Sequence, residues 1–328
     1  MYRRDGPSGP KLSMRHIVQN TLKAAVTFEG TGLHSGKPAK MVVHPAPAGH
    51  GITFVRVDIA LGNTLIPARW DMVERTALCT RLVNGAGVSV STVEHIMAAL
   101  AGCGVHNARV EIDGPEVPIM DGSSAEFVRE IMATGIQRLG VPVRAWKVLK
   151  PVMVETEDAR ATLLPCDRLK ISFDIDFAEE GIGHQSRELD LRNGTFAREL
   201  CDSRTFCRRA DVETMQANGL ALGGVPGENA VVFDGPTVHA GSGLRHPDEP
   251  VRHKMLDALG DLALAGAPIF GHYVGERAGH SLTNTLLRAL FDTPGAVREV
   301  TCDPIMTARL PGQGLVWSEI PAQVRRVA

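Results

Sequence analysis

The chain has 328 residues, of which 44% are hydrophobic and 22% charged, so it holds enough apolar material for two domains of ordinary size. Its formal net charge of −2 provides no overall field for nucleic acid or an acidic membrane, and an anionic ligand would have to meet local charges. Its six cysteines form no CxxC pair, and the sequence contains neither a signal-peptide pattern nor a long apolar run. We therefore expect a cytoplasmic protein with no transmembrane segment and no nucleic-acid partner.

The N-terminal region predicts strands after a short extension. Residues 1–14 are polar and contain Gly and Pro, and a strand-like pattern follows over 17–55. The stretch Gly30-Thr-Gly-Leu-His-Ser-Gly36 interrupts this pattern. Its third glycine comes one residue late for a dinucleotide-binding loop, and Pro38 follows where a helix should continue. A turn is therefore favoured over a phosphate cradle.

A helix is expected after Ser91, because Ser91-Thr-Val-Glu94 has the spacing of a capping box and an alanine-rich run continues to Leu100. The pattern then predicts a strand over 108–112, a helix from Asp121 to about residue 133, and a linker over 135–143.

The second half repeats the order of strands followed by helices. Strands are expected at 148–154, 161–164, 169–177 and 231–233, and helices at 210–217, 248–264 and 281–291. Strands covered by helices in both halves predict an α+β fold with two domains, 15–142 and 143–293. Residues 294–328 show no strong pattern and are expected to form a C-terminal tail.

The sequence His253-Lys-Met-Leu-Asp257-Ala-Leu-Gly-Asp261 places a histidine and two carboxylates on one helix face, because positions four apart lie above one another. A solvated face is the ordinary explanation of such a stripe. The apolar neighbours, however, indicate a largely buried helix, on which these groups would need partners. A metal ion would meet that need, since His nitrogen and carboxylate oxygen are ordinary zinc ligands.

The pair Glu94-His95 lies at the start of a predicted helix and suits a hydrolytic metal site. Such a site has three protein ligands, an open water position and a general base beside the water. His95 could supply the third ligand and Glu94 the base. On the sequence alone, the capping box is the better explanation of Glu94, and a lone histidine such as His95 is more often a core histidine than a ligand.

Three weaker motifs are compatible with the same chemistry. His280 precedes a predicted helix, where the helix dipole disfavours a cation unless a carboxylate such as Asp261 compensates. Lys254 could meet a diphosphate, and Ser203-Arg-Thr-Phe206 pairs a hydroxyl with an aromatic ring that could orient a sugar. A surface histidine, a solvated lysine and a loop anchor remain the alternatives.

Taken in order, these segments closely resemble the UDP-3-O-acyl-N-acetylglucosamine deacetylase family, the zinc deacetylases of lipid A synthesis. The resemblance covers roughly residues 17–293, and each motif is weak alone whereas the ordered set is specific. The matching stretches are Gly30–Gly36, Ser91–His95, Pro118–Ser124, Ser203–Phe206, His253–Asp261 and Gly279–His280.

The resemblance implies two α+β domains, each a two-layer sandwich of helices on a sheet, with the active site between them. It implies one catalytic zinc, for which iron(II) could substitute, and an acylated UDP-amino sugar as substrate. The implied metal ligands are His95, His253 and Asp257. The implied catalytic residues are Glu94 as general base, His280 as cationic or acid partner, Asp261 orienting His280, and Thr205 as oxyanion donor. The implied substrate contacts are Lys254, Phe206, Leu220 and Leu222, with Cys79 close to the metal.

Two other functions stay open at this stage. A zinc amidohydrolase of another acylated amino sugar would use the same residues. A non-catalytic nucleotide-sugar-binding protein would not need Glu94 and His280, and their presence argues against it. The chain also departs from the family at Cys207, where glycine is usual, which predicts a different backbone in that loop.

Overall fold

A computed structural model of the chain describes residues 18–76 and 78–325. The extension expected over 1–14 lies outside these residues. The described part is a mixed helix and sheet structure, which confirms the predicted α+β class. Within it, no helix combines the length and apolar character needed to cross a bilayer.

The first main sheet has five strands in the order β2-β3-β9-β4-β5, antiparallel except for the parallel pair β4–β9. Alternate residues of β3, such as Met41 and Val43, are buried, as expected for a sheet with one covered face. The glycine-rich stretch forms the turn between β2 and β3, as predicted. The strands are β2 (Val26–Thr31), β3 (Pro38–Pro45), β4 (Ile52–Arg56), β5 (Leu65–Pro67) and β9 (Ala108–Ile112).

The second main sheet is arranged around β19 (Ile269–Glu276), which pairs with β13, β14 and β11. This strand was not predicted, because Gly271 and Gly275 interrupt its apolar pattern. A Cβ at Gly275 would lie 2.8 Å from the Phe173 ring, so a glycine there allows the rings to pack on the strand. The other strands are β11 (Arg144–Val148), β12 (Val152–Glu155), β13 (Arg160–Pro165), β14 (Leu169–Asp176), β15 (His184–Asp190) and β20 (Val297–Thr301).

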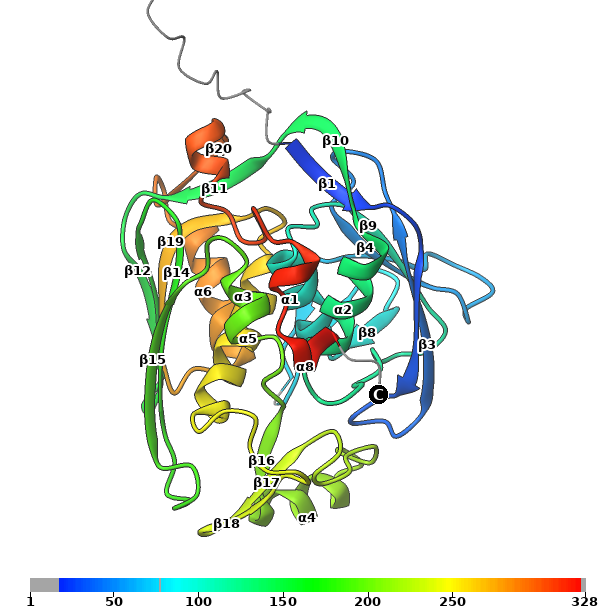
Figure 1. Cartoon of the computed structure of the whole chain (residues 1–328), viewed down its shortest axis with the longest axis vertical. Coiled ribbons are helices and arrows are strands. Elements are labelled where there is room, and N and C mark those ends of the chain that lie inside the picture. Colours follow the sequence, from blue (N-terminus) through cyan, green and yellow to red (C-terminus); the bar gives the residue numbers. More distant parts are fainter. Residues whose placement is uncertain (1–17, 77, 326–328) are drawn as a thin grey trace, which may run out of the picture.

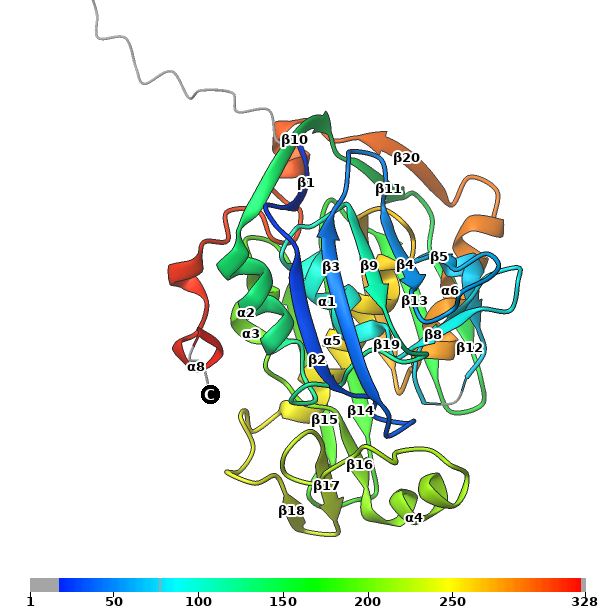
Figure 2. The ribbon, with the colours of Figure 1, turned by 90° about the vertical axis from the view of Figure 1, so that its right-hand side faces the viewer.

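The main helices of the sandwich lie between the two sheets (Figure 1). They are α1 (Glu94–Gly102), α2 (Ala125–Thr134), α5 (Glu249–Ala263) and α6 (His280–Asp292). α1 packs directly on α5, and apolar residues from both halves join one buried core. Figure 2 shows the first sheet from its outer side, with α1 behind it.

A smaller layer extends from one end of this sandwich (Figures 1 and 2). It contains β16 (Phe206–Arg208), α4 (Arg209–Ala217), β17 (Val231–Asp234) and β18 (Thr237–His239), with the strands in the order β16-β17-β18. The remaining elements are β1 (Val18–Leu22), η1 (Trp70–Met72), β6 (Val73–Glu74), β7 (Arg81–Val83), β8 (Ser89–Ser91), β10 (Ile136–Pro142), α3 (Thr195–Glu199), α7 (Pro304–Thr307), η2 (Trp317–Glu319) and α8 (Ala322–Arg325).

Two predictions about the connections were wrong. The expected linker over 135–143 is largely strand β10, which pairs antiparallel with β1. The expected strand over 148–154 is two strands, because the chain leaves β11 after Val148 and enters β12 only after Pro151, which cannot donate a ladder hydrogen bond. Residues 297–301 of the expected tail form β20, which pairs with β11. The domain boundaries stay a prediction.

Candidate metal centre and catalytic cleft

Helix α5 carries the predicted stripe of polar side chains. His253, Asp257 and Asp261 are all buried on it. Nδ1 of His253 lies 2.9 Å from the Ser203 carbonyl, which can only accept a hydrogen bond. This contact places the proton on Nδ1 and leaves the Nε2 lone pair available to a metal, the arrangement that commonly orients ligand histidines.

His95 of α1 joins His253 and Asp257 in a cluster whose possible ligand atoms lie within 4.8 Å of one another. Nε2 of His95 is 3.6 Å and Nε2 of His253 is 3.3 Å from the same oxygen, Oδ1 of Asp257. That oxygen is buried and has no hydrogen-bond partner among the described residues. A buried oxygen without a donor, facing two imidazole nitrogens, fits a bound cation.

The protonation states of His253 and Asp257 also fit metal binding, which requires neutral imidazole and ionised carboxylate. Burial lowers the pKa of His253 to about 4, so its imidazole is neutral at physiological pH. Burial opposes ionisation of Asp257, but the neighbouring His253 and Lys254 hold the pKa of its carboxyl well below the usual value.

Glu94 is the first residue of α1, and its side chain does not cap the helix. The capping-box prediction was wrong, because Ser91 belongs to β8 and residue 93 caps α1 without a side-chain hydrogen bond. Instead, Oε2 of Glu94 accepts a hydrogen bond of 3.0 Å from the backbone N–H of Thr80. Burial raises the pKa of Glu94, which suits a group that takes up a proton near neutral pH.

His280 is the first residue of α6 and stands between three carboxylates. Its Nδ1 lies 2.8 Å from Oδ2 of Asp261, and its Nε2 lies 3.7 Å from Oε1 of Glu94. Burial and the helix N-terminus both oppose a charge here, but the carboxylates, Asp261 foremost, raise the pKa of His280 to about 9. The imidazole is therefore a cation at neutral pH.

These residues open into a cavity of about 730 Å³ between the two main sheets and the smaller layer. Its lining includes the cluster of His95, His253 and Asp257 and residues of β16, α4 and the 220–224 segment. The predicted residues that line it are Glu94, His95, Thr205, Phe206, Leu220, His253, Lys254, Asp257 and His280. Asp261 lies behind His280, whereas the side chain of Leu222 is 54% exposed and does not line the cavity.

Phe206 forms an aromatic wall beside the cluster. Its ring lies 6.3 Å from that of His253 and contacts the rings of Phe177 and Phe233 edge-on. The neighbouring Cys207 sits in regular strand β16, paired with Val232, and burial raises the pKa of its thiol to about 11. A cysteine is accommodated here as an ordinary strand residue.

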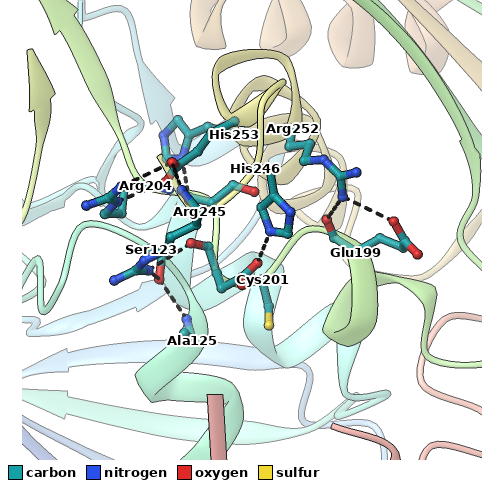
Figure 3. A network of polar contacts seen from close by, with 12 residues as sticks. Ser123, Ala125, Glu199, Cys201, Arg204, Arg245, His246, Arg252 and His253 are labelled. Atoms are coloured by element: carbon teal, nitrogen blue, oxygen red, sulfur yellow. Dashed lines mark hydrogen bonds and ion pairs between the residues drawn. The ribbon is translucent and has the colours of Figure 1, made fainter. Parts of the chain in front are cut away.

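A polar network that includes Arg204 lies next to His253 (Figure 3). It holds the loop whose Ser203 carbonyl contacts His253. Arg204 and Glu249 are 3% and 1% exposed and form a two-pronged ion pair, with Arg204 Nε 2.9 Å from Oε1. Glu249 is the first residue of α5, so this pair fastens the Ser203 loop to the helix that carries His253. Arg204 also donates to the carbonyls of Ala240 and Gly243.

The structure adds cavity residues that the sequence reasoning did not assign. His34, from the turn after β2, lines the cavity, and burial lowers its pKa. Its loop is held by Glu116, whose carboxylate accepts from the backbone N–H groups of His34 and Ser35. Thr92 also lines the cavity and has a left-handed φ of 59°, an unusual conformation for a β-branched residue. The only sequence feature that could have indicated a role for His34 is the glycine-rich motif that contains it.

A buried cluster of two imidazoles and one carboxylate, beside a second carboxylate and a cationic imidazole, is the arrangement of a metal-dependent hydrolase. The fold and the site therefore define an α+β enzyme of this class. The sequence profile of the UDP-3-O-acyl N-acetylglycosamine deacetylase family matches residues 19–292, and the chain belongs to this family.

Similar proteins are named UDP-3-O-acyl-N-acetylglucosamine deacetylase. The protein of Phenylobacterium zucineum (strain HLK1) is 46% identical over 86% of this chain and 96% of its own length. That of Anaeromyxobacter sp. (strain Fw109-5) is 45% identical over 91% of this chain and 97% of its own length. That of Myxococcus xanthus (strain DK1622) is 44% identical, with coverages of 92% and 94%.

Proposed function

We propose that this chain hydrolyses the N-acetyl group of UDP-3-O-acyl-N-acetylglucosamine, giving the free amine and acetate, the committed step of lipid A biosynthesis. The observation that carries the proposal is the convergence of His95, His253 and Asp257 beside Glu94 and His280 in the lining of one cavity. Family membership supports the choice of substrate. All six cysteines are free thiols, which supports a reducing, cytoplasmic location.

The metal is proposed to be zinc, held by His95, His253 and Asp257. Two imidazoles and one carboxylate are an ordinary donor set for catalytic zinc, which leaves a position open for water or substrate. When bound, the ion would acidify a water molecule and polarise the acetamide carbonyl. The hydrogen bond from His253 to the Ser203 carbonyl would keep that ligand in the required tautomer.

The chain's own residues would carry the proton transfers. Hydrolysis adds a water oxygen to the acetamide carbon and breaks the C–N bond, so one proton must leave the water and one must reach the amine. Glu94, with its raised pKa, is proposed to accept the first proton. Cationic His280, held by Asp261, is proposed to stabilise the oxyanion and protonate the amine.

Other cavity residues suit the rest of the substrate. Thr205 lines the cavity and is proposed to donate its hydroxyl to the oxyanion. Lys254 would meet the negative charge of the nucleotide sugar, and the Phe206 ring would pack on the sugar. Leu220 lies on the wall formed by the smaller layer, where an acyl chain would be covered. Leu222, exposed outside the cavity, is left out of this assignment.

Deacetylation of the acylated UDP-sugar by the purified, metal-loaded protein tests the proposal, with the product amine followed by mass spectrometry. The matched substrate is the same UDP-sugar without its 3-O-acyl chain. Because each buried methylene contributes about 0.8 kcal/mol, loss of the chain should lower kcat/KM by several decades. Equal efficiency on both substrates would favour an amidohydrolase of another amino sugar, and binding without hydrolysis would favour a nucleotide-sugar-binding protein.

A further inference from the structure

Thr80 is hydrogen bonded to two carboxylates that belong to different helices. It is 3% exposed and lies between Cys79 and strand β7. Its backbone N–H donates to Oε2 of Glu94 at 3.0 Å, and its hydroxyl donates to Oδ1 of Asp261 at 2.6 Å. One small residue therefore links the start of α1 to the end of the polar stripe on α5.

Each of these bonds uses the carboxylate oxygen that does not face His280. The other oxygen of Asp261, Oδ2, lies 2.8 Å from Nδ1 of His280, and the other oxygen of Glu94, Oε1, lies 3.7 Å from Nε2. The hydrogen bond from Thr80 thus fixes the rotation of the Asp261 carboxylate about its Cβ–Cγ bond. That rotation decides whether Oδ2 points at the imidazole.

Apart from its hydrogen bonds to Glu94 and Asp261, Thr80 takes no direct part in the site. It does not line the cavity and is not in the metal cluster. Its backbone carbonyl accepts a bond from the N–H of Val93, just before Glu94, so the segment is anchored at the beginning of α1. A buried hydroxyl donating to an ionised group is worth more than an ordinary hydrogen bond, since the charge strengthens it.

We propose that Thr80 is a positioning residue that fixes the base Glu94 and the Asp261–His280 pair in position relative to each other. The inference rests on the proposed function, because it concerns how that reaction is aligned. The hydroxyl acts through Asp261 on His280, whereas the backbone N–H acts on Glu94 and survives side-chain substitution. The consequences of the two contacts can therefore be separated by mutation.

Thr80→Val removes the hydroxyl at nearly constant volume and keeps the backbone donor to Glu94. The free energy of a hydrogen bond to a charged group is equivalent to roughly a 10- to 100-fold change in a rate or equilibrium constant. We expect kcat to fall by this factor when the hydroxyl is removed. KM for the acylated UDP-sugar and metal content should stay at wild-type values, because neither the cavity wall nor the ligands change. Thr80→Ser, which retains the hydroxyl, should restore kcat to within about threefold.

Thr21→Val is the matched control for loss of a buried hydroxyl. Thr21 of β1 is 2% exposed, and its hydroxyl donates to the Asn107 carbonyl at 2.7 Å, and neither residue lines the cavity. This variant should lose thermal stability but retain kcat. A fall in kcat for Thr21→Val equal to that for Thr80→Val would overturn the proposal, because general loosening would then explain both.

The decisive experiment is a double-mutant cycle with His280→Ala, measured on metal-loaded protein. If the Thr80 hydroxyl acts through His280, Thr80→Val should change kcat by less than about threefold once the imidazole is gone. The same fall in both backgrounds, a near-wild-type kcat for Thr80→Val, or a failed rescue by serine would overturn the inference. If Thr80→Val does not fold, Thr80→Ala takes its place in the cycle with the same expectations. An inactive wild-type enzyme would instead refute the proposed function.

Discussion

Gly260 of α5 lies against the backbone carbonyl of Glu94 in α1, so closely that a Cβ at position 260 would come within 2.0 Å of that oxygen. The neighbouring turns of the same two helices carry Asp257 and His95. The spacing between Glu94 and the cluster of His95, His253 and Asp257 is therefore set by a helix–helix contact that only glycine permits.

Gly260→Ala should lower turnover, because the added methyl group meets backbone and α1 must shift. By helix propensity alone, replacing glycine with alanine would stabilise the helix by about 1 kcal/mol. A loss of stability or activity would therefore show that the steric clash outweighs this gain. A displacement of about 1 Å in a catalytic group can cost roughly 100-fold in rate, which is the expected size. The control is Gly85→Ala, where a Cβ meets nothing within 4 Å. A more stable, fully active Gly260→Ala enzyme would refute the packing argument.

Glu94→Ala should retain its metal and lose turnover by about 10²–10⁴-fold, the usual contribution of a general base. Metal analysis and steady-state kinetics on the same preparation measure both. The exposed carboxylate Glu157 provides the control, and Glu157→Ala should match the wild type in both respects. Loss of metal from Glu94→Ala would instead make Glu94 a ligand, and unchanged turnover would leave it with a structural role.

The pH–rate profile should be a bell whose basic limb reports His280. Because the pKa of His280 is raised to about 9, the imidazole remains charged below that pH and loses its proton above it, so the rate should fall there. The acidic limb follows Glu94, which must be ionised to accept a proton and whose pKa is raised by burial.

Two variants separate this explanation of the basic limb from a second ionisation at the metal site. His280→Ala should slow turnover strongly and flatten the limb while keeping the metal. Asp261→Asn removes the foremost carboxylate beside His280 and should move the limb to lower pH. A limb that is unchanged in His280→Ala would assign it to the metal-bound species and remove His280 from the acid role.

Arg204→Met should destabilise the protein by about 3–5 kcal/mol, since it leaves the buried carboxylate of Glu249 without its counter-charge. Urea unfolding measures the change. The control is Arg208→Met, whose ion pair with Asp211 is 40% and 42% exposed and should contribute at most about 1 kcal/mol. Similar effects of the two substitutions would show that the Arg204 pair does not fasten the loop to α5.

The sequence predicted those parts of the fold that depend on local patterns. The period of α5 placed His253 and Asp257 on one face, and the turn at Gly30–Gly36 followed from its glycines. Strand β19 and the pairing of β10 with β1 were missed, because glycines and long-range pairing leave little local signal.

For the site, the sequence identified candidate residues but could not show that they lie next to one another. His95 and Asp257 are 162 positions apart, and only the packing of α1 on α5 brings them to 3.6 Å. The capping spacing at Ser91 was misleading, because the left-handed backbone at Thr92 turns the chain and leaves Glu94 free to reach Thr80. Thr80 itself belongs to no motif, since its role depends on two partners from other elements.

The metal content of His253→Ala decides whether the chain holds its metal at the cluster of His95, His253 and Asp257, because His253 is proposed to be a ligand through Nε2 and is fixed by Ser203 through Nδ1. Elemental analysis of the purified wild type should give one zinc per chain. His239→Ala, in the exposed strand β18, controls for the loss of a histidine and should keep that stoichiometry. His253→Ala should lose most of its tightly bound zinc, because one of three ligands is gone; wild-type stoichiometry in that variant would show that His253 is not a ligand.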